Sequence, residues 1–379
     1  MGVEETRVST LELFFDLVFV FTVTQLTTVV VEHPNGDGLA QVMVMLAAIW
    51  WMYAGYSWLT NVIDVGDTAH RGFLLAAMAA YLVLALAVPG AFSGSGLAFG
   101  LAYLVIIVVH SSLFSHAMSV NTAQAFLRVA PTNLVFAVAI VIGGALGGDA
   151  QWVIWPLSAA GLWVVPALRR AASGGFELKP SHFVERHGLV IIVALGESVV
   201  AIGIGAAGLP VDLDLVIVAV FGLALSAGLW WTYFSDEDDV QRVVREASHD
   251  DRARMGIEGF GYCHWVLLLG IVLVAAGLKK ATAHPFDPAS TAACVGLGGG
   301  VALFLVGDLL FRDRLGLTGG RGRAVVAAAS LATIPLGLVV AELQVAALVA
   351  LLAALVVSRL PLRPAARGPR PASPPAQPR

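Results

Sequence analysis

Long apolar runs of about 20 residues, separated by short polar or Gly/Pro clusters, recur along the whole chain of 379 residues. A helix of about 20 residues is what crosses the ~30 Å hydrocarbon core of a bilayer. A transmembrane barrel would instead need alternating polar and apolar residues over strands of ~10 residues, and the runs here are unbroken. The sequence therefore predicts an all-α, polytopic integral membrane protein whose main partner is the lipid bilayer.

Composition excludes several other classes of protein. The hydrophobic fraction is 58% and the charged fraction 13%, whereas soluble domains average about 45–50% and about 25%. A net charge of −4 excludes a strongly basic nucleic-acid-binding protein. We find no zinc-type cysteine spacing, nucleophile elbow or nucleotide-binding motif in a plausible context, so the sequence predicts no metal, no cofactor and no enzyme. It leaves oligomerisation open.

Hydropathy predicts about twelve transmembrane helices. The expected limits are 11–31, 39–60, 70–89, 97–118, 124–146, 152–170, 183–206, 213–234, 257–279, 291–311, 323–341 and 342–359. The last two have the least defined limits, because almost no connection separates them. They could instead form one buckled hairpin with Glu342 at its tip.

The basic residues give the expected orientation. With the N-terminus in the cytoplasm, and with helix ends counted with the adjoining loops, only Lys279 and Lys280 of the 22 Lys and Arg residues fall on the outer side. Cytoplasmic loops of membrane proteins carry an excess of Lys and Arg. We therefore expect a multipass protein of a bacterial cytoplasmic membrane with both termini in the cytoplasm. The N-terminus lacks signal-peptide form, so we expect the first run to be retained as a helix.

The chain also divides into two parts of similar layout. We expect a first six-helix half over residues 1–172, a cytoplasmic linker over 173–182, a second half over 183–359, and a disordered Pro/Arg-rich tail over 360–379. Aligning Glu12 with Glu185 places Gln25 opposite Ser198. Since six is an even number, the two halves would share one orientation, as parallel repeats do. The alternative is chance similarity between apolar helices.

Several ionisable residues lie inside the predicted spans, where they are costly and usually face the bundle interior. Glu12 and Asp16 are four residues apart and therefore share a helix face. They indicate either an ion or proton site, or an ion pair with Arg71, Arg128 or Arg186. Glu197 lies about 21 Å into the ~30 Å core, so it must be protonated, paired or facing a water-filled cavity. The predicted polar pathway comprises Glu12, Asp16, Gln25, Glu185, Glu197, Ser198 and His264.

Five stretches together resemble one known family. LELFFDLVFVFTVTQLT (Glu12, Asp16, Gln25), WLTNVIDVGD with Arg71, HFVERHGLVIIVALGESVVAIG (Glu185, Arg186, Glu197, Ser198), WWTYF and YCHWVLLLGI (His264) resemble signatures of the bacterial low temperature requirement A family. The resemblance covers residues 8–280. The remainder of the chain resembles the family only in its hydropathy. It departs at His187, where we expect an aromatic residue. The resemblance implies a multipass membrane protein linked to growth in the cold and implies no particular substrate.

We expect a transporter or channel that passes protons, small cations or a small solute along a carboxylate-lined path. The alternative is a structural or regulatory membrane protein linked to cold adaptation, in which Glu197 would sit in a dry, paired network. A third hypothesis is an intramembrane enzyme acting on a lipid, for which Glu185, Arg186 and His187 are the only candidates. A cavity joining Glu197 to Asp16 would discriminate between the first two.

Overall fold

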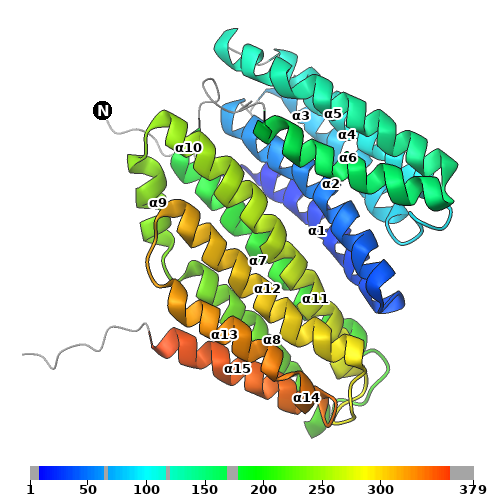
Figure 1. The fold of residues 1–379 in the computed structure, drawn as a ribbon, viewed down its shortest axis with the longest axis vertical. Helices are drawn as coiled ribbons and strands as arrows, with labels where there is room; N and C mark the ends of the chain where they lie inside the picture. The colour runs from blue at the N-terminus through cyan, green and yellow to red at the C-terminus, as the bar shows by residue number, and fades with distance from the viewer. Residues whose placement is uncertain (1–7, 64–66, 117–119, 169–177, 359–379) are drawn as a thin grey trace, which may run out of the picture.

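The chain folds into a bundle of long helices (Figure 1). The computed structural model describes residues 8–63, 67–116, 120–168 and 178–358, without the side chains of residues 115–128. Within these residues every regular element is a helix, and ten helical segments are long and apolar enough to cross a membrane. The prediction of an all-α polytopic membrane protein is therefore confirmed. The predicted tail, and residues 173–177 of the predicted linker, lie outside the described residues.

The helices of the amino-terminal part follow the hydropathy limits closely. They are α1 (Thr10–Glu32), α2 (Gly36–Val62), α3 (Thr68–Ala87), α4 (Gly96–His116), α5 (Val120–Leu146) and α6 (Gly148–Leu168). The carboxy-terminal part contains α7 (Pro180–Gly205), α8 (Leu213–Phe234), α9 (Glu237–Glu246), α10 (His249–Met255), the π-helix η1 (Gly256–Cys263), α11 (His264–Ala283), α12 (Thr291–Leu315), α13 (Gly320–Ala332), α14 (Ile334–Gly337) and α15 (Ala341–Val357).

The last two predicted spans are shorter and more broken than hydropathy indicates. The span expected at 323–341 consists of α13 followed by the single turn α14. Pro335 lies in that turn, and a proline cannot donate the backbone hydrogen bond that would continue a helix. With 13 residues α13 is about 20 Å long, so it crosses a ~30 Å core only together with α14.

The packing order of the first six helices recurs in the later ones. In the first part α1 packs on α2 and α3, α3 on α4, α4 on α5, α5 on α6, and α6 on α2. In the second part α7 packs on α8 and α11, α11 on α12, α12 on α13, α13 and α14 on α15, and α15 on α8. A duplicated six-helix unit would give this recurrence, which therefore supports the two predicted halves. The halves themselves stay a prediction.

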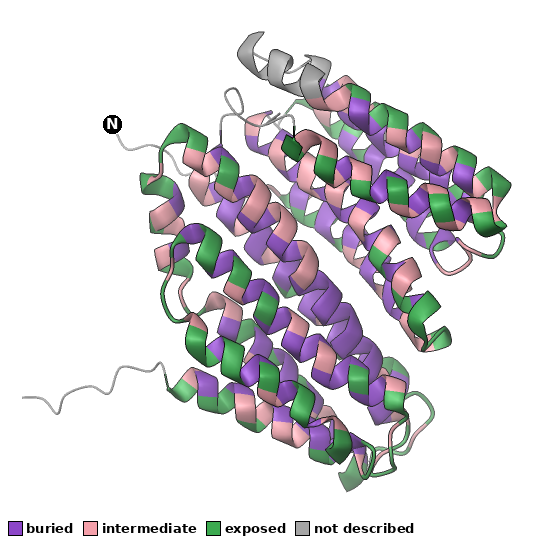
Figure 2. Cartoon of the chain, viewed as in Figure 1, coloured by how far each residue is buried: buried purple, intermediate pink, exposed green. Residues whose placement is uncertain are grey.

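The two parts meet along α1, α2, α7 and α11. Helix α1 contacts both α7 and α11, and α2 contacts the same two helices (Figure 1). The segment that contains α11 is the most buried span, and Figure 2 shows buried residues concentrated on α7 and α11. The outer helices expose apolar side chains such as Leu157 and Val220, as a lipid-facing surface requires.

Helices α11 and α12 cross closely at two glycines. A Cβ atom on Gly300 would lie 2.8 Å from the carbonyl oxygen of Gly270 and 2.8 Å from the backbone nitrogen of Val274. Membrane helices associate mainly through close packing of this kind, because lipid and side chains are equally apolar. The crossing thus fixes the position of α11 in the centre of the bundle.

We expect Gly300→Ala to destabilise the fold by about 1–3 kcal/mol, because the added methyl group overpacks this crossing. The matched control is Gly299→Ala, whose Cβ atom would have no neighbour closer than 3.9 Å. In a helix, alanine is favoured over glycine by about 1 kcal/mol, so the control should be neutral or stabilising. Thermal unfolding of both variants in detergent measures the difference, and equal stabilities would contradict the tight crossing.

Candidate functional site

The first turn of α1 fixes Glu12 in place. Ser9 is the N-cap residue, and its hydroxyl accepts a hydrogen bond from the Glu12 backbone nitrogen. The Glu12 Oε2 atom in turn accepts hydrogen bonds from the Ser9 backbone nitrogen and the Ser9 hydroxyl, both at 2.9 Å. This is a capping box, which satisfies otherwise unpaired groups at a helix start. Glu12 therefore enters the bundle in a defined conformation.

Glu12 and Asp16 meet residues from α2 and α7 in a buried group that we call the carboxylate cluster: Glu12, Asp16, Tyr53, His182 and Arg186. The Arg186 guanidinium lies 3.0 Å from Asp16 Oδ1 and 3.6 Å from Glu12 Oε1. His182 Nε2 lies 3.2 Å from Glu12, and the Tyr53 hydroxyl donates a 2.7 Å hydrogen bond to Asp16. All five side chains are buried. The shared helix face predicted for the two carboxylates is thus the face that meets α7.

The hydrogen bonds around His182 indicate its protonation. The Asn61 amide nitrogen lies 3.2 Å from His182 Nδ1, and the same nitrogen donates to the Lys179 carbonyl. The Asn61 oxygen accepts from the Lys179 backbone nitrogen, which fixes the amide orientation. Asn61 therefore donates to Nδ1, and a neutral His182 donates from Nε2 to Glu12.

With both carboxylates ionised and His182 neutral, the carboxylate cluster carries one more negative charge than positive charge. Two carboxylates face one guanidinium, and no other charged side chain among the described residues forms an ion pair with them. Asp16 Oδ2 and the Arg186 Nε and Nη1 atoms are buried without a hydrogen-bond partner in the described part of the chain. A buried unmatched charge is costly, so the cluster is suited to take up one further positive charge.

Of the three predicted cationic partners, the structure selects Arg186. Arg71 is exposed on α3, and the side chain of Arg128 lies outside the described residues. The Arg186 guanidinium also lies 5.8 Å from the ring centres of Phe15 and Tyr53, so aromatic faces complete its surroundings. Both readings of Glu12 and Asp16 therefore remain compatible, because an ion-paired group can also line a pathway.

Glu197 forms a second buried acidic site further along α7. The Thr24 hydroxyl donates to Glu197 Oε2, and Lys279 of α11 attracts the carboxylate electrostatically. Ser198 is fully buried, and its hydroxyl has no partner within the described residues. Gln25 is half-buried on α1. The polar residues in the carboxy-terminal half of α1 are thus linked to Glu197 by the hydrogen bond from Thr24.

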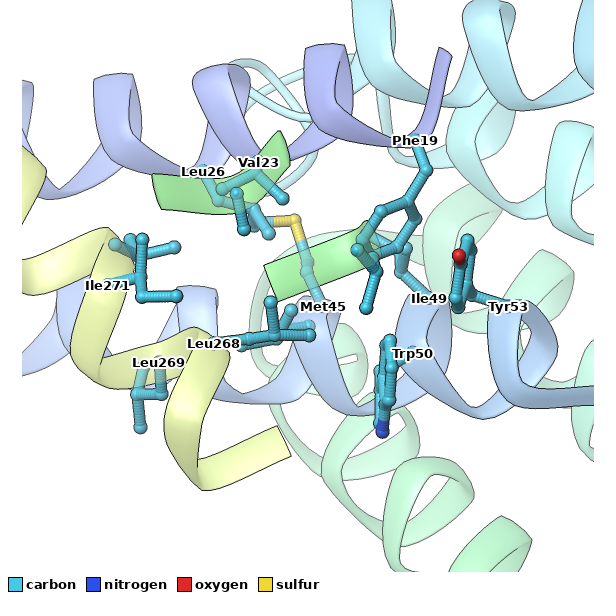
Figure 3. Close-up of a cluster of buried hydrophobic side chains, with 14 of the residues drawn as sticks. Phe19, Val23, Leu26, Met45, Ile49, Trp50, Tyr53, Leu268, Leu269 and Ile271 are labelled. Carbon is cyan, nitrogen blue, oxygen red and sulfur yellow. The ribbon is translucent and has the colours of Figure 1, made fainter. Parts of the chain in front are cut away.

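An apolar layer separates the two acidic sites. Between them α1 contributes Phe19 and Val23, and α7 contributes Val190, Ile191 and Ala194, all fully buried. Met45 and Ile49 of α2 and Leu268 of α11 pack into the same level (Figure 3). Arg186 and Glu197 are eleven positions apart on α7, which corresponds to about 16 Å. Asp16 and Glu197 are therefore not in contact.

A cavity among the described residues lies elsewhere in the bundle. It has a volume of about 540 Å³ and is bounded by α2, α4, α5, α6, α10 and η1. Neither Asp16 nor Glu197 lines it. The open connection that would favour a conducting path is thus not formed by this cavity.

His264 belongs to an aromatic group rather than to either acidic site. It follows the π-helix η1, and its Nδ1 atom lies 3.1 Å from the Gly259 carbonyl, so Nδ1 is the donor. Its Nε2 atom therefore accepts the 2.8 Å hydrogen bond from the Tyr233 hydroxyl of α8. The ring stacks on Trp50 with 6.3 Å between centroids. π-Helical turns are frequent at functional sites, and this one sets the position of a neutral, fully bonded histidine.

The remaining candidates on α7, Glu185, Arg186 and His187, lie in three different surroundings. Glu185 is half-buried and stands apart from the carboxylate cluster, while Arg186 is bound within it. His187 is fully buried and donates from Nδ1 to the Phe183 carbonyl at 2.9 Å. Its ring packs against Phe183, Trp50 and Phe260. His187 therefore takes the place of an aromatic residue, which explains the departure from the expected motif.

A second buried charge network was missed by the sequence analysis. Asp308 and Arg312 of α12 meet Arg323 of α13 and Asp236, the residue that precedes α9. Arg312 lies 3.2 Å from Asp308 and 2.5 Å from Asp236, and Arg323 bonds to both Asp308 and the Thr232 carbonyl. The sequence did carry a signal: Asp308 lies inside a predicted span, four residues from Arg312. We call these four residues the Asp308 network.

His182 and Tyr53 were also missed as members of the site. His182 and Arg186 are four residues apart on α7, which matches the spacing of Glu12 and Asp16 on α1. Two helices that pack side by side can pair such residues. This matched spacing was the available signal, whereas nothing in the sequence indicated Tyr53.

Comparison with known proteins gives a family match and a related protein. The family model described as bacterial low temperature requirement A protein matches residues 7–358. An uncharacterized protein from Rhizobium meliloti (strain 1021) is 26% identical over 323 residues, which cover 81% of this chain and 77% of that protein.

Proposed function

The chain belongs to the bacterial low temperature requirement A family, and from this premise we propose that it moves protons or small monovalent cations across the bacterial cytoplasmic membrane. The observation that carries the proposal is that two buried carboxylates of the carboxylate cluster, Glu12 and Asp16, face a single guanidinium, that of Arg186. One proton or one monovalent cation would bring Glu12, Asp16 and Arg186 to neutrality. Small solutes coupled to such an ion fall within the same proposal.

The cluster lies at the end of the bundle where α1 begins, which we place in the cytoplasm with both termini. This orientation follows the excess of basic residues in the loops of that side. A cation entering from the cytoplasm would meet Glu12 and Asp16 first. Glu197 would be the second binding site, which the cation reaches after crossing the apolar layer.

The apolar layer acts as the gate in this proposal. Hydrophobic constrictions block ions because water leaves them readily. Passage from Asp16 to Glu197 would require α1 to shift against α7, and the two helices belong to different halves of the bundle. Rocking of one repeat against another around a central site is a common route to alternating access.

Flux measurements test the proposal at Glu197. We expect Glu197→Gln to abolish most of the ion flux in proteoliposomes under proton, sodium or potassium gradients, followed with a dye inside the vesicles that is selective for the ion of each gradient. Glutamine keeps the size of the side chain and the Thr24 contact but removes the charge. Glu185→Gln is the matched control on the same helix, since Glu185 stands apart from both acidic sites.

The control variant should retain the flux of the unmodified protein. Size-exclusion profiles and thermal unfolding must show that Glu197→Gln is folded. Unchanged flux through a folded Glu197→Gln variant would overturn the role of Glu197. Absence of flux in the unmodified protein under all three gradients would overturn ion movement itself.

One observation favours a second candidate function, a structural or regulatory membrane protein without a pore. The apolar layer leaves the two acidic sites in separate buried surroundings, and each has its own hydrogen bonds. Such a protein would give no flux under any gradient. Its carboxylate cluster would then serve to join α1 to α7.

A further inference from the structure

The cavity between the amino-terminal helices and the α10–η1 segment has the character of a ligand site. Its volume of about 540 Å³ is within the range of about 300–1,000 Å³ that small-molecule sites occupy. Its lining is mainly apolar and contains Trp51, Trp58, Phe114, Trp163 and Tyr262. No acidic residue of the proposed ion path lines it. The cavity is therefore separate from the proposed ion path, and its function must be considered independently.

The aromatic rings form an ordered wall. Trp163 lies between Trp51, at 6.2 Å between centroids, and Tyr262, at 5.1 Å and nearly parallel. The Trp51 ring nitrogen donates to Asn133 and the Trp163 ring nitrogen to the Ala47 carbonyl, each at 3.0 Å. The Tyr262 hydroxyl donates to the Trp163 carbonyl at 3.1 Å. Because the polar atoms of the three rings are bonded, what the rings offer to a ligand is their faces.

The three rings are also only partly covered by the rest of the protein. Trp51, Trp163 and Tyr262 are half-buried, whereas Asn133 beside them is buried. All three rings also form part of the cavity lining. The uncovered ring surface at the cavity is therefore available to an apolar ligand.

Among the described residues, the carboxylates and guanidinium groups that line the cavity come from α10 and η1. These are Asp250, Arg254 and Glu258. Arg254 lies 3.1 Å from Asp251, and Glu258 lies 2.7 Å from Arg314, so both are matched by neighbours. Asp250 has only His249 close to it, at 3.7 Å. With His249 neutral, the rim keeps the negative charge of Asp250.

We infer that this cavity binds an amphipathic organic cation, with its apolar body against the wall of Trp51, Trp163 and Tyr262. Aromatic faces attract organic cations through the ring quadrupole, and tryptophan does so most strongly. The acidic rim adds attraction for the same charge. An anionic ligand would gain nothing from the ring faces and would be repelled by Asp250. This inference stands apart from the proposed ion movement, because it concerns binding alone.

Binding of tritiated tetraphenylphosphonium to the purified full-length protein in detergent tests the inference, read by scintillation proximity. We expect saturable binding that unlabelled tetraphenylphosphonium competes away. Triphenylphosphine oxide, which has a similar triphenyl body but no net charge, should compete at least about ten-fold more weakly, since it lacks the cation–π attraction. Equal competition by the two compounds would overturn the assignment to cations.

Variants locate the bound cation. We expect Trp51→Leu and Tyr262→Leu each to weaken tetraphenylphosphonium binding by about ten-fold, and Asp250→Asn by about two-fold. The control is Trp231→Leu, because Trp231 is an exposed residue of α8 that does not line the cavity. Two independent wall variants keep the test decisive if one of them fails to fold. Unchanged binding in a folded wall variant, or equal loss in the control, would overturn the site.

Discussion

Replacing Arg186 with methionine is expected to lower the free energy of unfolding by about 3–5 kcal/mol, because it leaves two carboxylates buried without their cation. Glu12 and Asp16 are 2% and 0% exposed, so water cannot take over the role of the guanidinium. Chemical denaturation in detergent micelles measures the loss. Methionine keeps the apolar stem, and the loss therefore reports the charge rather than the packing.

A compensating variant separates the charge effect from a general packing defect. Adding Asp16→Asn to Arg186→Met removes one of the two unmatched charges, while Glu12 keeps His182 and Ser9 as partners. The double variant should therefore be more stable than Arg186→Met alone. Glu185→Gln, the neighbouring position, should change stability by less than about 0.5 kcal/mol. If the double variant were less stable than the single one, the ion pair would not be the cause.

Asp308→Ala is expected to destabilise the protein by a similar amount, about 3–5 kcal/mol, since it removes the buried carboxylate that pairs with both Arg312 and Arg323. Arg323 is 0% exposed and Asp308 1%, and the Asp308 carboxylate contacts both guanidinium groups, whereas Asp236 is the closer partner of Arg312 alone. The Asp308 network ties α12 and α13 to the end of α8 and the start of α9. Its loss should therefore loosen the whole carboxy-terminal end of the bundle.

The same denaturation experiment distinguishes this network from ordinary surface charge. Asp236→Ala should cost less than Asp308→Ala, because the Asp236 side chain is 30% exposed and water can replace part of its role. Asp239→Ala removes an exposed pair with Arg242 and should cost no more than about 1 kcal/mol. Equal losses in all three variants would show that burial does not decide the strength of this network.

The helices were largely predictable because each span is a local property of the sequence. A run of about 20 apolar residues favours a membrane-spanning helix whatever its neighbours are. The limits expected for 213–234 coincide with α8, and those for 11–31 differ from α1 by one residue at each end. The prediction was poorest at 323–341, where Pro335 and the packing of Gly337 against Gln344 break the helix.

The site was predictable only in part. The spacing of Glu12 and Asp16 fixed their common face, and Arg186 was among three cations named as partners. The choice between Arg71, Arg128 and Arg186 needed the packing of α1 against α7, which brings together residues 170 positions apart. The aromatic cavity could not be located from the sequence, because the tryptophans that line it come from both α2 and α6, which only the packing of the helices brings together.

For this protein, the sequence by itself determined the membrane environment, the helices and the presence of acids inside the spans, since these depend on local hydropathy and spacing. Only the tertiary structure decided that Asp16 and Glu197 are separated by an apolar layer and that Arg186 and Thr24 are their partners. The physical reason is that helix contacts depend on side-chain shape at close range. Local periodicity gives the face that a residue occupies, and packing gives the residue that it meets.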